Sequence, residues 1–153
     1  MIFGFPYAMS PSPKRKHQVI ERKFIVLAND ALQQAQKSCA CEIYHGLDWI
    51  IDDSTVVRPD AMIVCGKFDE DFLNFPPALI VEIASKGTIM KDRNIKFSLY
   101  QSQGVPYYIL VHPDAQRIET YQLINNFYQE VESESFQLTP KCTINLNLQR
   151  IWL

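Results

Sequence analysis

Apolar and polar residues recur along this chain with two periods, one typical of helices and one typical of strands. Apolar side chains at every third or fourth position predict helices over residues 16–37 and 90–103. The second of these helices is expected to stop at Gly104, because glycine commonly ends helices. Shorter apolar runs bounded by turn residues predict strands over residues 40–44, 47–51, 56–65, 78–85 and 106–112.

The remaining segments complete a fold prediction. Two alternating runs flank Asn125–Asn126 and predict a closing β-hairpin, and residues 144–153 form a further alternating segment. The run over residues 78–85 is apolar on both faces apart from Glu82, which is typical of a central strand covered on both sides. The order of elements is a helix, a β meander, a β-α-β unit and a hairpin. It predicts an α/β fold class, with one mixed sheet covered by helices in a single domain of residues 1–153.

Composition places few limits on the class of protein. A chain of 153 residues with 47% hydrophobic and 21% charged residues is long enough to bury a core. No apolar run approaches the roughly 20 residues of a membrane span. The first charges follow the N-terminal apolar residues, whereas a signal peptide has the opposite order. We therefore expect a cytoplasmic protein without a membrane partner.

Four cysteines lie at positions 39, 41, 65 and 142. Cys39 and Cys41 with His45 could form half of a zinc site, but the spacing fits no standard zinc pattern and no second pair follows. Reduced and mostly buried thiols are therefore expected, as is usual in the cytoplasm.

Basic residues are clustered although the net charge is −2. Local basic patches matter more than the total charge for contact with phosphate. A solvated helix face explains each cluster equally well. The first cluster contains Lys14, Arg15, Lys16, Arg22 and Lys23, and the second contains Lys86, Lys91, Arg93 and Lys96.

Three charged residues interrupt the apolar pattern. Asp60 follows Pro59 at the mouth of an apolar strand, and side-chain alternation predicts that it faces the same side as Met62 and Val64. Glu82 lies in the middle of the most apolar strand. Lys96 occupies the centre of the apolar stripe of the second helix, at about 100° per residue. Two carboxylates and one ammonium are thus predicted to point towards the interior.

These three residues have two interpretations. The first is a buried ion-pair network, in which removal of one partner costs about 3 to 5 kcal/mol. The second is a metal-dependent phosphodiesterase site, in which two carboxylates on adjacent strands hold Mg²⁺ or Mn²⁺ and the lysine orients or deprotonates the attacking water. We prefer the second interpretation because a single metal-dependent site accounts for all three unusually placed charged residues.

Several motifs resemble those of a known family. The stretches "RPDAMIVCG", "PPALIVEIAS", "KDRNIKFSLYQSQGVPYYILVHP" and "PYAMSPSPKRKHQ" are similar to the Uma-type family of restriction-endonuclease-like proteins, over about residues 6–123. That family, formerly a domain of unknown function, is assigned to the PD-(D/E)XK nuclease superfamily. The resemblance implies a restriction-endonuclease-like core, with a four- or five-stranded mixed sheet and a helix on each face. It also implies that Asp60 and Glu82 are the two acidic motif residues.

The resemblance leaves the lysine and the accessory residues less defined. The usual superfamily lysine position, two residues after Glu82, is Ala84 here. The resemblance therefore points to Lys96 on the following helix, with Lys86 as the fallback. Superfamily members can add an acidic residue from the first helix, and two residues there are accessory candidates: His17, alternatively a core or cap histidine, and Glu21, alternatively a surface residue. Asp92, one turn before Lys96 on the second helix, is a third candidate and alternatively a simple partner of Lys96.

Together these observations predict a Mg²⁺-dependent DNA endonuclease. The alternative is a catalytically inactive nuclease-fold module that binds DNA or a protein partner. A homodimer is expected, because cleavage of two strands by a single-site nuclease usually calls for two copies. Candidate contact surfaces are the loop with Phe68, Phe72 and Phe75 and the apolar end at residues 151–153.

Overall fold

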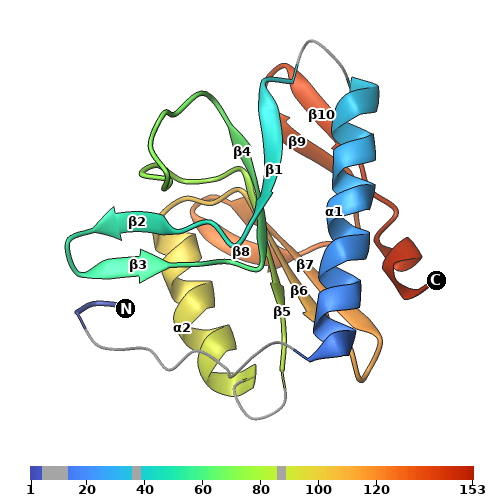
Figure 1. The fold of residues 1–153 in the computed structure, drawn as a ribbon, viewed down its shortest axis with the longest axis horizontal. Helices are drawn as coiled ribbons and strands as arrows, with labels where there is room; N and C mark the ends of the chain where they lie inside the picture. The colour runs from blue at the N-terminus through green and yellow to red at the C-terminus, as the bar shows by residue number, and fades with distance from the viewer. Residues whose placement is uncertain (5–13, 36–38, 86–88) are drawn as a thin grey trace.

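A six-stranded mixed sheet forms the centre of the molecule (Figure 1). The computed structural model describes residues 1–4, 14–35, 39–85 and 89–153, apart from the side chains of residues 89–92. Strands β5 and β6 are parallel, and every other neighbouring pair is antiparallel. In spatial order the strands are β1 (Cys41–His45), β4 (Ala61–Cys65), β5 (Leu79–Ile83), β6 (Tyr107–His112), β7 (Arg117–Ile124) and β8 (Phe127–Glu130). The predicted mixed sheet with helices is confirmed, and it has six strands rather than four or five.

Two helices cover opposite faces of this sheet, as Figure 1 shows. Helix α1 (Arg15–Ala35) packs on one face, in a core cluster that includes Ile63 and Val81. Helix α2 (Ile89–Ser102) connects the parallel strands β5 and β6 and packs on the other face. Every residue of β5 and β6 is buried, which explains their nearly continuous apolar sequence.

Smaller elements add to the two hydrophobic cores, one between the sheet and α1 (the α1-side core) and one between the sheet and α2 (the α2-side core). The hairpin of β2 (Trp49–Asp52) and β3 (Thr55–Val57) joins the α2-side core. The pair β9 (Ser135–Thr139) and β10 (Cys142–Asn145), followed by the 3₁₀ turn η2 (Leu148–Trp152), joins the α1-side core. The sequence patterns had not predicted β9.

Local chemistry explains where the elements end. The run over residues 56–65 was predicted as one strand, but Pro59 has no N–H for the ladder, and the run is divided into β3 and β4. Both residues of the β7–β8 turn, Asn125 and Asn126, have positive φ (52° and 70°), as a two-residue hairpin turn favours. The predicted hairpin is therefore confirmed. The predicted C-terminal end of the first helix, at residues 36 and 37, lies outside the described residues.

The prediction of reduced cysteines is wrong in this structure. Cys41 and Cys65 stand opposite one another in the β1–β4 register and form a disulfide, and Cys142 on β10 forms a second disulfide with Cys39. The partners are 24 and 103 residues apart, so only the folded topology brings them together. Neither Cys39 nor Cys41 is a thiolate available to zinc in this state.

Within the described part of the chain, no helix has the length and apolar character needed to cross a membrane.

The surfaces predicted for a dimer are partly used within the chain. The ring of Phe68 packs against Phe75 and Tyr44, at centroid distances of 5.9 and 5.6 Å. Ile151 is buried in the α1-side core, whereas Leu153 is exposed. Homodimer formation stays a prediction.

Candidate active site

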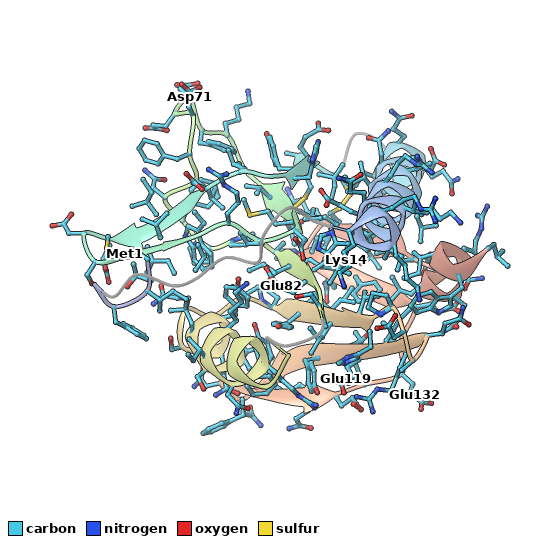
Figure 2. The ribbon with its side chains drawn as sticks, turned by 60° about the horizontal axis from the view of Figure 1, so that its bottom comes forward. Met1, Lys14, Asp71, Glu82, Glu119 and Glu132 are labelled. Atoms are coloured by element: carbon cyan, nitrogen blue, oxygen red, sulfur yellow. A yellow bond between two sulfur atoms is a disulfide. The ribbon has the colours of Figure 1, made fainter. Side chains whose placement is uncertain are left out.

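Glu82 is the only charged residue of β5, and helix α2 supplies its partners. The ammonium of Lys96 donates to Glu82 Oε2 at 2.7 Å, and the hydroxyl of Tyr100 donates to Oε1 at 3.4 Å. The two side chains of the ion pair are nearly buried, with 10% of Glu82 and 16% of Lys96 exposed. Figure 2 shows Glu82 between the two helices. The structure thus brings Lys96 against Glu82, on the side that the helical wheel predicted.

The packing of α2 fixes this arrangement. Lys96 and Tyr100 are four residues apart and lie on the same face of the helix. Tyr100 is completely buried beside Leu99 in the α2-side core. Burial, reinforced by the neighbouring Glu82 carboxylate, holds the pKa of Tyr100 well above its usual value. The phenol therefore stays protonated and serves as a donor that orients Glu82.

Asp60 lies in the bend immediately before β4. Its Oδ2 accepts the backbone N–H of Ile83 at 2.7 Å, and its Oδ1 lies 3.2 Å from Nε2 of His17. The sequence predicted that Asp60 faces the same side of the sheet as Met62 and Val64. Its contacts do not follow this alternation, because Asp60 precedes the regular strand. Its carboxylate instead reaches the end of β5 and helix α1.

The strand register places Asp60 close to Glu82. Ala61 pairs with Val81 at the end of the antiparallel β4–β5 ladder, and the carboxylate of the preceding Asp60 accepts the N–H of Ile83, the neighbour of Glu82. Both carboxylates act electrostatically on His17 on one side and on Tyr100 on the other. The two predicted acidic residues therefore meet at one end of the sheet.

Helix α1 contributes His17 and Glu21 to the same end. Nδ1 of His17 lies 3.6 Å from Oε2 of Glu21 and has no hydrogen-bond partner among the described residues. The interpretation of Glu21 as a surface residue is wrong, because only 20% of its side chain is exposed. Oε1 of Glu21 lies 3.3 Å from Nδ1 of His45.

His45 was considered in the sequence only as a zinc ligand, and its place beside this site was missed. The signal is in the strand register, which pairs His45 with Ala61, the neighbour of Asp60. No spacing along the chain could have revealed this pairing.

The electrostatics of the α1 side favour a charged histidine. The hydrogen bond to Asp60 is the largest influence on His17 and raises its pKa, although burial opposes this effect. Burial is the largest influence on Glu21 and also raises its pKa, with Asp60 adding repulsion. The contact with Asp60 therefore favours the imidazolium form of His17, and Glu21 carries a desolvated carboxyl group.

These residues offer a suitable donor set for a divalent cation. His17, Glu21 and Asp60 each present a ligand atom, and the three atoms lie within 4.8 Å of one another. Carboxylate oxygens suit Mg²⁺ and Mn²⁺, and an imidazole nitrogen suits Mn²⁺ and other transition metals. Asp60 is shared between this set and the predicted pair with Glu82. The residues present therefore fit a metal.

Two sequence candidates cannot be placed. Lys86 lies outside the described residues, and Asp92 belongs to α2 with a side chain outside the described part. The predicted pairing of Asp92 with Lys96 is therefore untested.

A second buried carboxylate lies on the same face of the sheet, two strands away. Glu119 accepts from Arg117 at 2.7 Å and from the Tyr121 hydroxyl at 2.8 Å, and Arg93 of α2 lies 3.2 Å from it. Such a hydrogen-bonded group needs no further ligand. Arg93, counted above in a basic cluster, therefore contributes to a structural network.

The comparisons with known proteins identify the family and the fold of the chain. The family model described as "Putative restriction endonuclease", Uma2, matches residues 1–150. The chain belongs to the Uma2 family. Because the match covers nearly the whole chain, the candidate site lies entirely within the family domain.

A solved structure has a similar fold. It is described as "a putative nuclease belonging to DUF820" from Anabaena variabilis ATCC 29413. The TM-score is 0.71 at 14% sequence identity, and the match covers 95% of this chain and 87% of the other. At this identity the likeness shows the fold alone. The search of curated proteins found no match.

Proposed function

We propose that the chain is a DNA endonuclease that depends on Mg²⁺ or Mn²⁺, with Asp60, Glu82 and Lys96 as its catalytic residues. The main support is the pairing of buried Glu82 with Lys96 at 2.7 Å, at the sheet end where Asp60 also lies. A buried cation beside two convergent carboxylates matches the needs of phosphodiester hydrolysis. Membership of a family described as restriction endonucleases supports the same reaction class.

Each residue has a defined role in this proposal. Asp60 and Glu82 offer oxygen ligands, and the N–H of Ile83 fixes the Asp60 carboxylate. A divalent ion, when bound, supplies Lewis acidity and lowers the pKa of its bound water. The Lys96 ammonium orients the attacking water and offsets the negative charge that develops on the phosphate.

Three further residues position or complete this site. Tyr100 holds the Glu82 carboxylate in place. His17 and Glu21 border Asp60 and are accessory ligands or orienting groups.

A cleavage assay tests the proposal. Wild type should cut a DNA duplex or single strand with Mg²⁺ or Mn²⁺, and Glu82→Gln should be inactive. Lys96→Met should retain metal binding but turn over orders of magnitude more slowly, because a positioned charge in a buried site is lost. Lys67→Met, on an exposed loop, is the matched control and should cut normally. A wild type without cleavage, or a fully active Lys96→Met, would refute the assignment.

Lys86→Met should have a much smaller effect than Lys96→Met. The opposite pattern would transfer the catalytic role to Lys86.

The competing function is a non-catalytic module that binds DNA or a protein. It is favoured by one observation: the ammonium of Lys96 lies 2.7 Å from Glu82 and balances the charge of that carboxylate. Calorimetric titration with Mn²⁺ separates the two functions. Binding to wild type that is lost in Asp60→Asn supports the enzyme, and no binding to wild type supports the inactive module.

A homodimer remains part of the proposal, because a single site per chain needs two copies to cut both strands in one encounter. Sedimentation at high protein concentration should show a dimer, and a monomer throughout would refute this part.

A further inference from the structure

A groove of about 460 Å³ runs along one flank of α1. Its walls are the first turns of α1, the β6–β7 turn and the 3₁₀ turn η2. Its cationic lining consists of Lys14, Arg15, Lys16 and Lys23. Ile151 and Trp152 of η2 give it an apolar wall on the opposite side.

The groove concentrates positive charge in a protein whose net charge is −2. Lys14, Arg15 and Lys16 are exposed, and the described lining contains no acidic side chain. Beside the groove, Lys16 contacts the exposed Asp114 at 3.0 Å, and Lys23 donates to the carbonyl of Leu153. Four cations, of which Lys16 is paired with Asp114 and Lys23 with the main-chain oxygen of Leu153, leave a net positive surface, which favours a polyanionic ligand.

An unpaired donor adds an independent observation. The indole Nε1 of Trp152 is buried and has no acceptor among the described residues. An indole N–H is only a donor, and leaving such a group unpaired is unfavourable. Trp152 also lines the groove, so a ligand seated there lies beside this indole.

The groove begins beside the candidate active site. Lys16 directly precedes His17, whose imidazole contacts Asp60. In Figure 1 the start of α1 lies next to the C-terminal end of β5, and α1 contacts this strand. A strand that leaves the site along α1 therefore meets these cations in succession.

We propose that this groove binds the sugar–phosphate backbone of a nucleic acid, and that it guides the strand leading away from the candidate active site. Lysine and arginine contacts to phosphate supply sequence-independent affinity and set the register of the bound strand. The link to cleavage rests on the proposed function, but binding in the groove requires no metal.

Intrinsic fluorescence provides a local probe. The chain has two tryptophans, and Trp49 is 1% exposed in the α2-side core. A fluorescence change on adding a short DNA duplex in EDTA should therefore report Trp152. Trp152→Phe should abolish this change, while anisotropy of a labelled duplex should still detect binding.

Charge variants test the contacts themselves. Lys16→Gln/Lys23→Gln removes two cations from the groove. Lys67→Gln/Lys141→Gln removes two exposed cations that do not line it. The groove variant should weaken duplex binding and reduce the slope of log affinity against log salt by about 2, at roughly 0.9 per phosphate contact. The control should keep the wild-type slope, and circular dichroism should show that both variants are folded.

The outcomes separate this inference from the proposed function. Equal affinity and slope for the two double variants would overturn the groove assignment, even if wild type cleaves DNA. An equal Trp152 response to polyglutamate at matched charge would also overturn it, because the groove would then accept any polyanion. Duplex binding through the groove without cleavage in Mg²⁺ or Mn²⁺ would support the groove and refute the nuclease proposal.

Discussion

Removal of the Lys96 ammonium should destabilise the fold. The decrease in the free energy of unfolding measures how strongly Lys96 interacts with Glu82. The ammonium and the Glu82 carboxylate are 2.7 Å apart, which corresponds to an attraction of about 6 kcal/mol at an effective dielectric constant of roughly 20. Desolvation of both groups offsets much of this attraction. Lys96→Met nevertheless leaves a buried carboxylate without its ammonium, so we expect a loss of about 3 to 5 kcal/mol in the free energy of unfolding.

A double-mutant cycle tests this reasoning. Glu82→Gln alone leaves the lysine buried without its carboxylate, so it should also destabilise the protein. Glu82→Gln/Lys96→Met removes both charges and should be more stable than either single variant, with a coupling energy of about 2 kcal/mol. Urea unfolding at pH 7 in EDTA provides the measurement. The exposed control Lys67→Met should stay within about 0.5 kcal/mol of wild type.

Two results would refute the reasoning. One is a loss of less than about 1 kcal/mol for Lys96→Met, far below the effect of breaking a buried pair. The other is a double variant whose loss equals the sum of the two single losses. Repulsion between two carboxylates alone would predict that removing one leaves the metal-free protein at least as stable. The ion pair with Lys96 predicts the opposite for Glu82.

Three further predictions concern the α1 side and the disulfides. The raised pKa of His17 means that its contact with Asp60 stabilises the fold below about pH 6.5 and ceases to do so as the pH rises through the raised pKa. The deficit of His17→Gln in urea unfolding should therefore be larger at pH 6 than at pH 8, and a constant deficit would contradict this. Burial raises the pKa of Glu21, so its ionised form destabilises the fold at pH 7. Glu21→Gln should therefore unfold at a higher urea concentration than wild type at pH 7. This difference should shrink as the pH falls towards about 4.3, where the wild-type carboxyl group is also neutral. Cys142→Ser should lower Tm more than Cys65→Ser, because the disulfide of Cys142 spans 103 residues and that of Cys65 spans 24. Loops of these lengths correspond to about 5 and about 3 kcal/mol of stabilisation. A Tm unaffected by reducing agent would argue against both bonds.

Local patterns were sufficient for the helices and the buried strands. Leu99 and Tyr100 of α2 are buried against the sheet, and Lys96 lies between them on the helical wheel, so its orientation towards the sheet followed from the helical period. The buried strand β5 was equally clear, because Glu82 is the single polar interruption in it. These features depend on residues close together in the chain, which a sequence pattern can read.

Features that depend on strand register could not be read in this way. His45 reaches the site only because β1 pairs with β4, and Cys142 reaches Cys39 only because β10 packs on the α1 face. Asp60 precedes β4, so the alternation rule gave the wrong neighbours for its carboxylate. Each of these features depends on the pairing or packing of elements that are distant in the sequence.

The arrangement of charges at the sheet end predicts that a site with two carboxylates can stay folded without a metal. Asp60 is paired with His17 from α1, and Glu82 is paired with Lys96 from α2. The helices lie on opposite faces of the sheet, yet each directs one cation to the same end. When His17 is protonated, these two cations supply the double positive charge that a divalent ion would otherwise provide. Loss of the metal should therefore abolish activity well before it unfolds the protein, whereas loss of either cation should affect stability directly.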